Sequence, residues 1–278
     1  MHYGAPRDLI LGLRFLNGSG QRISTGGKVV KNVAGYDMTR LMIGSAGTLG
    51  LITEITCRVM TIPERCSAIG AEGTLSACAS LASEVITSHL VPVFVVIMPI
   101  NDQDNEIARQ PCKLKIGFEG FDKTVTEQLK RTRILLEKTD MTIGQEQDYT
   151  VQEGIFENAY SELSQAAYIV RADLPLDRVP GFVESLDRWL PESRLFVDYG
   201  CGRIFVGFEN MPNGLWPQLC EAGSQLGGHV VMEKATAEFK TNNDVFGVHR
   251  PEWKVMHRIK AALDPQQVFS PGRLPGKV

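Results

Sequence analysis

The stretch GSAGTLG at residues 44–50 is the part of the sequence whose residue types and spacing most directly suggest chemistry. Glycines allow the backbone to pass close to a flat or bulky ligand and to turn several amide groups toward one acceptor. The dinucleotide pattern G-x-G-x-x-G and the phosphate loop G-x-x-x-x-G-K-[ST] are absent here, which disfavours a nicotinamide site and a nucleoside triphosphatase. The residues alone suggest at most a ligand site lined by backbone, because glycines at this density more often form ordinary tight turns.

Regular elements on both sides must hold this glycine-rich run in place. Asp37 is a suitable cap for a short helix over 37–43, and Gly44 follows the last apolar residue, where a left-handed end is usual. After the run, apolar and polar residues alternate over 51–60, which is the period of a β-strand. The sequence therefore predicts a helix, a glycine turn and a strand in succession.

Four stretches together resemble the FAD-linked oxidases of the vanillyl-alcohol-oxidase or PCMH type. They are YGAPRDLILG at 3–12, KNVAGYD at 31–37, GSAGTLGLITEIT at 44–56 and DPQQVFSPGR at 264–273. The first is similar to the family pattern YG-x-x-RD-x-x-LG. The last is similar to D-P-x-x-x-F-N-P-G-R, with Ser270 in the place of the asparagine. Within the family, the sequence resembles the FAD-binding subunits of glycolate oxidases.

The resemblance implies FAD as the cofactor and assigns residues to it. The implied contacts to the adenosine, the pyrophosphate and the adenine edge are Gly44, Ser45, Gly47, Thr48, Gly50 and the backbone of Ile52. Gly4 and Asp8 are implied to lie beside the flavin, with capping of a turn as the alternative for Asp8. Lys31, Asn32 and Tyr36 belong to the KNVAGYD motif, and packing of the Tyr36 ring on the core with a bonded hydroxyl is the preferred interpretation.

The order of elements divides the chain into three segments. Residues 1–63 contain a predicted hairpin around the Asn17-Gly18-Ser19-Gly20 turn and are, by resemblance, the second half of the FAD-binding domain. Residues 64–240 repeat the order β-α-β-β-α-β twice, as two ferredoxin-like units that could join into one antiparallel sheet with helices on one face. By resemblance, residues 241–278 are expected to return to the FAD domain. The predicted fold is α+β, the C-terminal part of a PCMH-type FAD-binding domain plus a ferredoxin-like cap domain.

Two connections carry predictions of their own. A helix over about 148–165 is expected to bridge the two repeats, and residues 236–251 are expected to form a long loop. In the resembling family a phosphate-cradling glycine loop precedes the YG-x-x-RD motif, whereas this sequence begins at that motif. The first half of the flavin domain is therefore expected to be lacking, which would leave sheet edges unpaired.

A hydroxy-acid oxidase needs a cation for the substrate carboxylate and a base for the hydroxyl proton, while hydride passes to the flavin. Arg171 and Arg203, on predicted cap strands, could be such cations, but surface ion pairing is the preferred interpretation for each. The five histidines form no metal-binding set, and the family's catalytic stretch G-H-x-G-D-G-N-x-H has no counterpart. No metal site is predicted, and the catalytic residues stay unassigned.

Composition excludes several other classes of function. The chain is 43% hydrophobic and 22% charged with a net charge of −3, which is ordinary for a globular protein and argues against a nucleic-acid partner. Six scattered cysteines without C-x-x-C predict free thiols in a reducing compartment. No apolar run is long enough for a transmembrane segment, and no signal-peptide pattern is present. We expect a cytoplasmic protein, or one held peripherally at the inner membrane by partners.

The leading hypothesis is an FAD-dependent oxidoreductase, the FAD-binding subunit of a glycolate oxidase-like complex. It would convert a short 2-hydroxy acid to the 2-oxo acid, with a larger FAD-linked oxidase subunit and an iron–sulfur subunit as partners. The alternative is a non-catalytic assembly subunit, or a truncated product, that does not hold FAD alone. A D-lactate dehydrogenase of the same superfamily is a third option, against which the missing histidine stretch counts.

Overall fold

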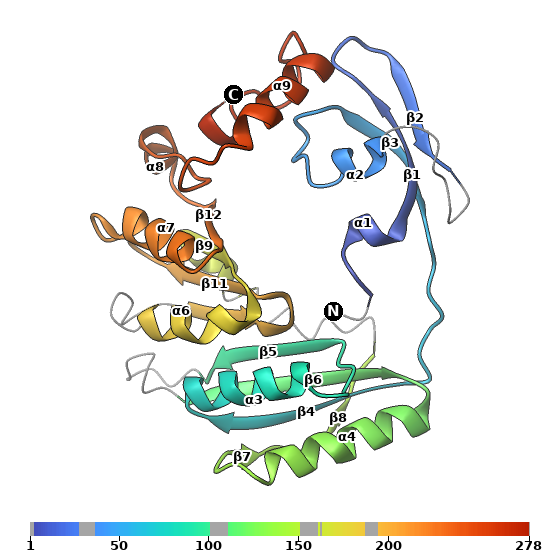
Figure 1. Ribbon diagram of the computed structural model, residues 1–278, viewed down its shortest axis with the longest axis vertical. Helices are drawn as coiled ribbons and strands as arrows, with labels where there is room; N and C mark the ends of the chain where they lie inside the picture. The colour runs from blue at the N-terminus through green and yellow to red at the C-terminus, as the bar shows by residue number, and fades with distance from the viewer. Residues whose placement is uncertain are drawn as a thin grey trace. The chain divides into compact units, whose positions relative to one another are not determined.

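The computed structural model describes residues 3–27, 37–100, 111–150, 161, 163–186 and 194–277. The chain divides into two compact units. Unit 1 contains Ile62–Val248, and unit 2 contains Tyr3–Thr61 together with His249–Val278 (Figure 1). Segments from both ends of the chain therefore fold into the same unit, while the middle of the chain forms the other.

Among its described residues, unit 2 is organised by a three-stranded antiparallel sheet. Its strands are β1 (Ile10–Leu16), β2 (Arg22–Gly26) and β3 (Leu51–Cys57), in the spatial order β2-β1-β3. Its helices are α1 (Pro6–Leu9), α2 (Met38–Met42) and α9 (Trp253–Leu263), and a 3₁₀ turn follows at Pro275–Lys277. Leu13 and Phe15 of β1 form a small core with Met42 and Leu49, and Ile259 of α9 packs against it.

The hairpin between β1 and β2 lies where the sequence predicts it. The side-chain oxygen of Asn17 accepts hydrogen bonds from the backbone amides of Ser19 and Gln21, at 3.1 and 2.8 Å. Gly18 has to be a glycine, because a Cβ there would lie 2.2 Å from a carboxylate oxygen of Asp264. The turn is thus held against the segment that follows α9.

Unit 1 repeats one order of elements. The first repeat contains β4 (Arg65–Gly73), α3 (Leu75–Thr87), β5 (Phe94–Pro99), β6 (Cys112–Gly120), α4 (Asp122–Leu136) and β7 (Thr142–Ile143). The second contains β9 (Tyr168–Asp173), α6 (Val179–Leu186), β10 (Arg194–Asp198), β11 (Arg203–Phe208), α7 (Leu215–Gln225) and β12 (His229–Lys234). Both repeats run strand–helix–strand–strand–helix–strand, as predicted.

The two repeats share one antiparallel sheet. Among the described residues its order is β12-β9-β11-β10-β5-β6-β4-β7, and β8 (Gln147–Asp148) also pairs with β4. Each repeat has its own strands in the ferredoxin-like order 4-1-3-2. The repeats join where β5 pairs with β10, with Ile97 opposite Val197. The prediction of an α+β fold with one antiparallel sheet is confirmed.

The sheet of unit 1 has two different faces. Successive side chains of a strand point to opposite faces, and one set packs with α3, α4, α6 and α7 in a large apolar core, as Ile69, Leu114 and Val170 do. We call the opposite side the second face. It carries a smaller cluster of buried apolar residues, which are Ala68, Phe94, Val96 and Phe196. The second face also carries the charged residues considered below.

Two predicted connections differ from the structure in part. The helix expected over about 148–165 is absent at its start, where Gln147–Asp148 is strand β8, but residues 161 and 163–165 are helical as predicted, and residues 151–160 lie outside the described range. The long loop expected over 236–251 contains helix α8 (Ala237–Asn242). The Thr236 hydroxyl oxygen accepts a hydrogen bond from the amide of Phe239 and so caps this helix. A helix of six residues with a threonine cap has too little apolar periodicity to be recognised in the sequence.

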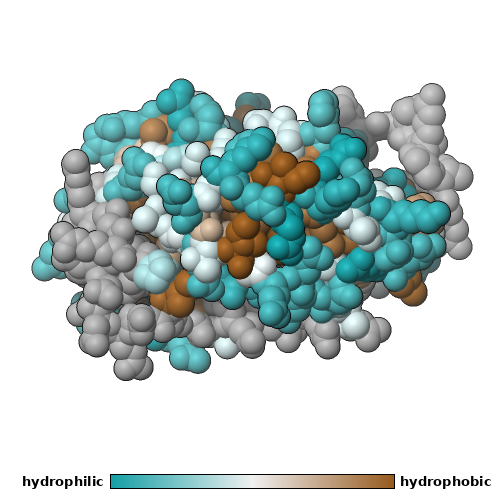
Figure 2. Space-filling view, turned by 90° about the horizontal axis from the view of Figure 1, so that it is seen from below, coloured by the Kyte–Doolittle hydropathy of each residue, from teal (hydrophilic) through white to brown (hydrophobic). Residues whose placement is uncertain are grey.

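Seen from the side on which α4 lies, the surface is mainly hydrophilic around a limited apolar area (Figure 2). The exposed large apolar residues of unit 1 include Val91, Phe121 and Ile134. Scattered apolar residues of this kind are normal on a folded protein. We therefore assign no function to this surface.

Candidate functional site

The glycine-rich run of residues 44–50 forms a tight turn between α2 and β3. Asp37 caps α2 as predicted, since its carboxylate accepts a hydrogen bond from the amide of Arg40 at 3.0 Å. The backbone then enters the left-handed region at Gly44, with a φ of +82°. Ala46 and Gly47 follow with φ values of +53° and +71°, and the amide of Thr48 donates to the carbonyl of Ser45 at 3.0 Å. Two successive positive φ values closed by this bond are typical of a type I′ turn.

The outer side of this turn is suited to a ligand. Gly44, Ala46 and Gly47 are exposed, and Ser45 is half-buried. A Cβ at Gly44 would meet nothing within 4 Å, and one at Gly47 would meet only the Ser270 hydroxyl, at 3.6 Å. In the described part of the chain, the amides of Ala46 and Gly47 donate no hydrogen bond. An anionic or hydroxyl-bearing ligand could accept from both amides.

Two of the predicted contact residues face the interior instead. Thr48 is fully buried, and its hydroxyl donates to the carbonyl of Ser45 at 2.7 Å. Gly50 is also buried, and a Cβ there would lie 2.6 Å from the carbonyl oxygen of Leu16. These two residues shape the turn and pack it on β1. Gly44, Ser45 and Gly47 are the members that stay accessible to a cofactor.

A buried lysine fixes the inner side of the turn. The ammonium of Lys260, on α9, donates to the carbonyl of Thr48 at 2.8 Å and to the carbonyl of Phe269 at 2.7 Å. Its third donor goes to the carboxylate of Asp264. All three ammonium protons are therefore bound, which is the condition for burying a lysine. This network joins the turn to the DPQQVFSPGR stretch at 264–273.

The carboxylate of Asp264 completes the network. Asp264 is fully buried and accepts hydrogen bonds from the amides of Val268 and Phe269, at 2.9 and 2.8 Å. Burial raises the pKa of this carboxyl, but the Lys260 ammonium and the two amides outweigh burial and hold the pKa below its usual value. Asp264 is therefore charged at neutral pH. Sequence reasoning singled out the Asp264-Pro265 pair but missed Lys260, whose only sequence signal is its position four residues earlier on the same helix.

The other predicted cofactor residues of unit 2 lie elsewhere on its sheet. The Asp8 carboxylate accepts from the amide of Ala5 at 2.8 Å, so Asp8 caps α1, and a Cβ at Gly4 would lie 2.9 Å from that carboxylate. Asp8 precedes β1, whereas the glycine turn adjoins its far end, where Leu16 pairs with Leu51. Seven strand residues separate the two places, which is roughly 20 Å. One small ligand cannot contact both, but an extended dinucleotide could.

The remaining predicted residues of the site divide into two groups. The backbone of Ile52 pairs with Phe15 in the sheet, and 36% of the Ile52 side chain is exposed. A ligand at the edge of β3 could therefore reach it. Lys31, Asn32 and Tyr36 lie outside the described residues.

The two candidate cations of unit 1 are engaged in ion pairs. The Asp173 carboxylate accepts from Arg171 and from Arg203, at 2.8 Å each, and lies 3.3 Å from the ring of His229. Arg171 also donates to Glu233. Burial raises the pKa of Asp173, but the two guanidinium groups outweigh burial and lower it. This cluster lies on the second face of the sheet, across strands β11, β9 and β12.

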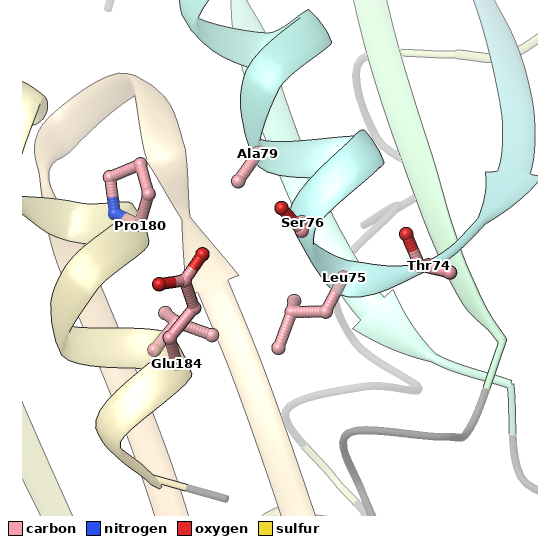
Figure 3. A pocket seen from close by; sticks show the side chains of 7 residues that line it. Thr74, Leu75, Ser76, Ala79, Pro180 and Glu184 are labelled. Carbon is pink, nitrogen blue, oxygen red and sulfur yellow. The ribbon is translucent and has the colours of Figure 1, made fainter.

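A small pocket of about 90 Å³ lies between α3 and α6 (Figure 3). Its lining includes Thr74, Ser76 and Glu184. The Thr74 hydroxyl already accepts from the amide of Ala77 as the cap of α3. Pockets that hold drug-sized ligands are typically several times larger, about 300–1,000 Å³. None of the predicted cofactor residues lines this pocket, and it is too small for a flavin.

Neither a metal site nor a membrane-spanning helix is found among the described residues. Within the described ranges, no three or more His, Cys, Asp or Glu side chains come together in a way that would hold a metal ion. None of the helices in that part of the chain combines the length and apolar character needed to cross a membrane. None of the six cysteines forms a disulfide, and only Cys57 and Cys201 are exposed.

Comparison with known proteins identifies relatives of this chain. Residues 247–274, which include Lys260 and Asp264, match the family model "FAD linked oxidases, C-terminal domain". Over 98% of its length the chain is 30% identical to the glycolate oxidase subunit GlcE of Escherichia coli (strain K12), and it covers 66% of that protein. It is 47% identical to the mitochondrial D-lactate dehydrogenase [cytochrome] of Arabidopsis thaliana, covering 99% of this chain and 53% of that one.

Solved structures share the fold. An alkyldihydroxyacetonephosphate synthase superposes on 97% of this chain with a TM-score of 0.59 at 17% identity, and the match covers 54% of that protein. The chain thus spans between about half and two thirds of the length of these relatives. By its sequence, its fold and the two motifs that Lys260 joins, the chain belongs to the FAD-linked oxidases of the PCMH type.

Proposed function

We propose that this chain is the FAD-binding subunit of a glycolate oxidase-like complex that oxidises a short 2-hydroxy acid to the 2-oxo acid. FAD is the cofactor of the family, and hydroxy-acid oxidation is the chemistry that the names of its relatives describe. The observation that carries the proposal is the Lys260 network. It supports the glycine turn from inside while the outer side of the turn keeps two amide donors for a ligand.

In this proposal the chain binds and orients the cofactor. Bound FAD would supply the chemistry, by accepting the hydride of the substrate. The accessible amides of Ala46 and Gly47 would bind oxygen atoms of the cofactor, and Gly44 and Ser45 would lie along it. Gly4, Asp8 and Ile52 would contact other parts of the extended molecule. Thr48 and Gly50 would act through the shape of the turn.

The substrate carboxylate needs a cation, and the second face of unit 1 carries several. The guanidinium of Arg203 uses one nitrogen for Asp173 and is 44% exposed. Its remaining donors have no partner in the described part of the chain. Arg203 is therefore a better candidate for the carboxylate than Arg171, which donates to both Asp173 and Glu233.

A complex with other subunits is part of the proposal. The relatives named as glycolate oxidase subunits, GlcD of Bacillus subtilis and GlcE, support an assembly with a larger FAD-linked oxidase subunit. An iron–sulfur subunit would accept the electrons. Such a complex would operate in the cytoplasm or at the inner membrane through its partners. Copurification of a tagged chain from its own source, followed by mass spectrometry, would test this assembly.

Flavin retention is the experiment that tests the proposal. The purified chain is incubated with FAD, passed over a gel-filtration column and examined for a visible flavin band. Gly47→Ala should reduce the retained flavin, because the new methyl group enters the candidate cradle. Gly20→Ala is the matched control: it also has a positive φ, of +75°, but lies in the β1–β2 turn with nothing within 4 Å of the new Cβ. Equal retention by both variants would contradict the assignment of the turn.

The substrate is tested on the flavin-loaded chain. Bleaching of the visible band by glycolate, and its absence with D-lactate, would support a glycolate oxidase-like specificity. The reverse preference would favour the D-lactate dehydrogenase alternative. If the chain remains colourless after incubation with FAD, the result would favour the alternative of a non-catalytic assembly subunit that does not hold FAD alone.

A further inference from the structure

Ser270 is a polar residue beside the glycine turn of residues 44–50, and the proposed function gives it no role. A Cβ at Gly47 would lie 3.6 Å from the Ser270 hydroxyl. Gly47 is exposed and Ser270 is half-buried. Both residues belong to unit 2, although they come from opposite ends of the chain. The hydroxyl therefore lies on the outer side of the turn, next to the residue whose amide is available to a ligand.

The hydroxyl of Ser270 is an unused hydrogen-bond donor. The hydroxyls of Ser88, Ser164 and Ser185 each donate to the backbone carbonyl three residues earlier. Ser270 makes no such bond, and its hydroxyl has no other partner in the described part of the chain. A hydroxyl carries one donor and two acceptor lone pairs. All of them remain available to a ligand at this position.

Unusual backbone conformations meet at the same place. Ala46 and Ser270 both have a positive φ, of +53° and +39°, which is uncommon for residues other than glycine. Ala46 precedes Gly47 in the chain, and the Ser270 side chain approaches Gly47 from the other segment. Strain of this kind persists only where the surrounding structure enforces it, and it is concentrated at ligand sites. The two strained residues lie on either side of one exposed glycine.

The Lys260 network holds Ser270 in position through the preceding residue. The carbonyl of Phe269 accepts a hydrogen bond from Lys260 at 2.7 Å, and the amide of Phe269 donates to Asp264 at 2.8 Å. Both partners are buried side chains. The same ammonium binds the carbonyl of Thr48, so the turn and Ser270 are fixed by one group. A donor that is already positioned costs little entropy when a ligand binds.

The surroundings of the hydroxyl suit an anionic group. The amide of Arg273 donates to the carbonyl of Ser270 at 3.3 Å, which brings Arg273 into the same turn of chain. The Arg273 side chain is exposed and has no ion-pair partner among the described residues. The carboxylate of Asp264 is buried and paired with Lys260. Clustered amide donors in turns of this kind commonly bind phosphate groups.

We propose that the Ser270 hydroxyl donates a hydrogen bond to a pyrophosphate oxygen of FAD, as a third donor beside the amides of Ala46 and Gly47. The inference rests on the proposed position of the cofactor along the glycine turn. It gives the segment after α9 a direct part in binding, in addition to its support of the turn. An asparagine at position 270, as in the motif of the resembling family, would also offer a donor.

The test measures the affinity of the full chain for FAD by isothermal titration calorimetry. Ser270→Ala should weaken binding about ten- to a hundredfold, the range for loss of one hydrogen bond to a charged group. Ser270→Asn should bind FAD almost as tightly as the wild type. ADP carries the two phosphates without the flavin and should show the same loss with Ser270→Ala. Riboflavin has no phosphate, and its binding should not respond to the substitution.

Ser270→Gly separates binding from folding. Glycine tolerates the left-handed region, so this variant should unfold at a higher urea concentration than the wild type and yet bind FAD as weakly as Ser270→Ala does. A purely structural role would move stability and affinity in the same direction. Gln267→Gly is the matched control, because Gln267 is exposed and has a φ of +53°. It should raise the urea midpoint and leave the affinity for FAD unchanged.

Equal FAD affinities of the wild type and Ser270→Ala would overturn the inference. A loss with FAD but not with ADP would overturn the assignment to the pyrophosphate. A wild type that binds neither compound would overturn the inference together with the position of the cofactor on the turn. The substrate is a separate question: bleaching by glycolate with equal affinities contradicts only this inference, and weaker binding by Ser270→Ala without bleaching contradicts only the proposed substrate.

Discussion

A buried ion pair between Lys260 and Asp264 joins separate segments of unit 2. A buried ion pair is not stabilising in general, because desolvation offsets the attraction between the charges. Here every donor of the ammonium is bound, and two of its three acceptors are backbone carbonyls from separate segments. As a result, the Lys260 side chain holds the glycine turn next to the segment that follows α9.

Loss of the lysine should therefore cost more than an ordinary substitution. We expect Lys260→Met to destabilise unit 2 by about 3–5 kcal/mol, because it leaves the buried Asp264 carboxylate without its cation. Urea unfolding followed by the fluorescence of Trp253, which is buried in unit 2, measures the change after Trp189 and Trp216 are replaced by phenylalanine. Lys254→Met, at an exposed position of α9, is the control and should stay within about 0.5 kcal/mol. Equal losses in both variants would contradict the role of the network.

The same network predicts that the stability of unit 2 falls at low pH. The pKa of Asp264 is lower in the folded chain than in the unfolded chain, so the unfolded state binds the proton more readily. Its contribution to stability is present above the unfolded pKa, near 4, and is lost as the pH falls through the folded pKa. The difference in unfolding free energy between the wild type and Asp264→Asn should shrink as the pH is lowered below about 4. A difference that is constant with pH would show that the carboxyl is not the titrating group.

A substitution at Ala46 tests whether the backbone of the glycine turn at residues 44–50 is strained. A non-glycine residue in the left-handed region costs roughly 1–2 kcal/mol, and Ala46 has a φ of +53°. We expect Ala46→Gly to raise the unfolding free energy of unit 2, by about 1 kcal/mol. Ala261→Gly makes the same chemical change at an exposed position of α9 and should give a loss, not a gain, because glycine weakens a helix interior. Gains of similar size at both positions would mean that the turn is not strained.

At the residue scale, local signals were predictable and long-range partners were not. The Asp37 cap and the left-handed Gly44 follow from neighbours a few residues away, and both are present. Nothing near Lys260 in the sequence shows that it is buried, because its partner Thr48 lies on a distant segment. Ion pairing was the preferred expectation for Arg171, and its pair with Asp173 lies within β9. Its second pair, with Glu233, depends on the pairing of β9 with β12 and could not be predicted.

At the element scale, periodicity predicted the long elements and failed at the short ones. Both repeats of unit 1 have enough apolar residues per element to give the right order. Strand β8 has two residues and is defined only by its pairing with β4, so no period exists for it in the sequence. The pairing of β5 with β10 is likewise a tertiary contact that local sequence does not specify, because either edge strand of each repeat could have paired.

Two glycines of unit 1 should respond in opposite directions to the same change. A Cβ at Gly117, on β6, would lie 2.0 Å from the ring of Phe94, so Gly117→Ala should destabilise unit 1 by about 1–3 kcal/mol. A Cβ at Gly181, on α6, would meet nothing within 4 Å, so Gly181→Ala should stabilise it by about 0.5–1 kcal/mol. Urea unfolding followed by circular dichroism measures both. A loss at Gly181 would mean that α6 is not a regular helix there.

At the scale of the whole molecule, the chain is two units built from three segments. Unit 2 needs both Tyr3–Thr61 and His249–Val278, because the Lys260 network and the contact of Gly18 with Asp264 join them. Among the described residues, unit 1 is a single continuous segment, and the strands of its sheet find their partners inside that segment. The cofactor residues predicted from the sequence all belong to unit 2, whereas the candidate cations for a carboxylate belong to unit 1.

This division predicts that residues 62–248 fold without the rest of the chain. The sheet and the four helices that pack on it share one large apolar core inside this segment, and a segment of this size can bury enough surface to be stable. We expect the fragment 62–248 to unfold in one cooperative transition in urea. The midpoint should be lowered by Gly117→Ala, as in the full chain. A fragment that unfolds gradually and binds a hydrophobic dye would be a molten state, and its core would then depend on unit 2.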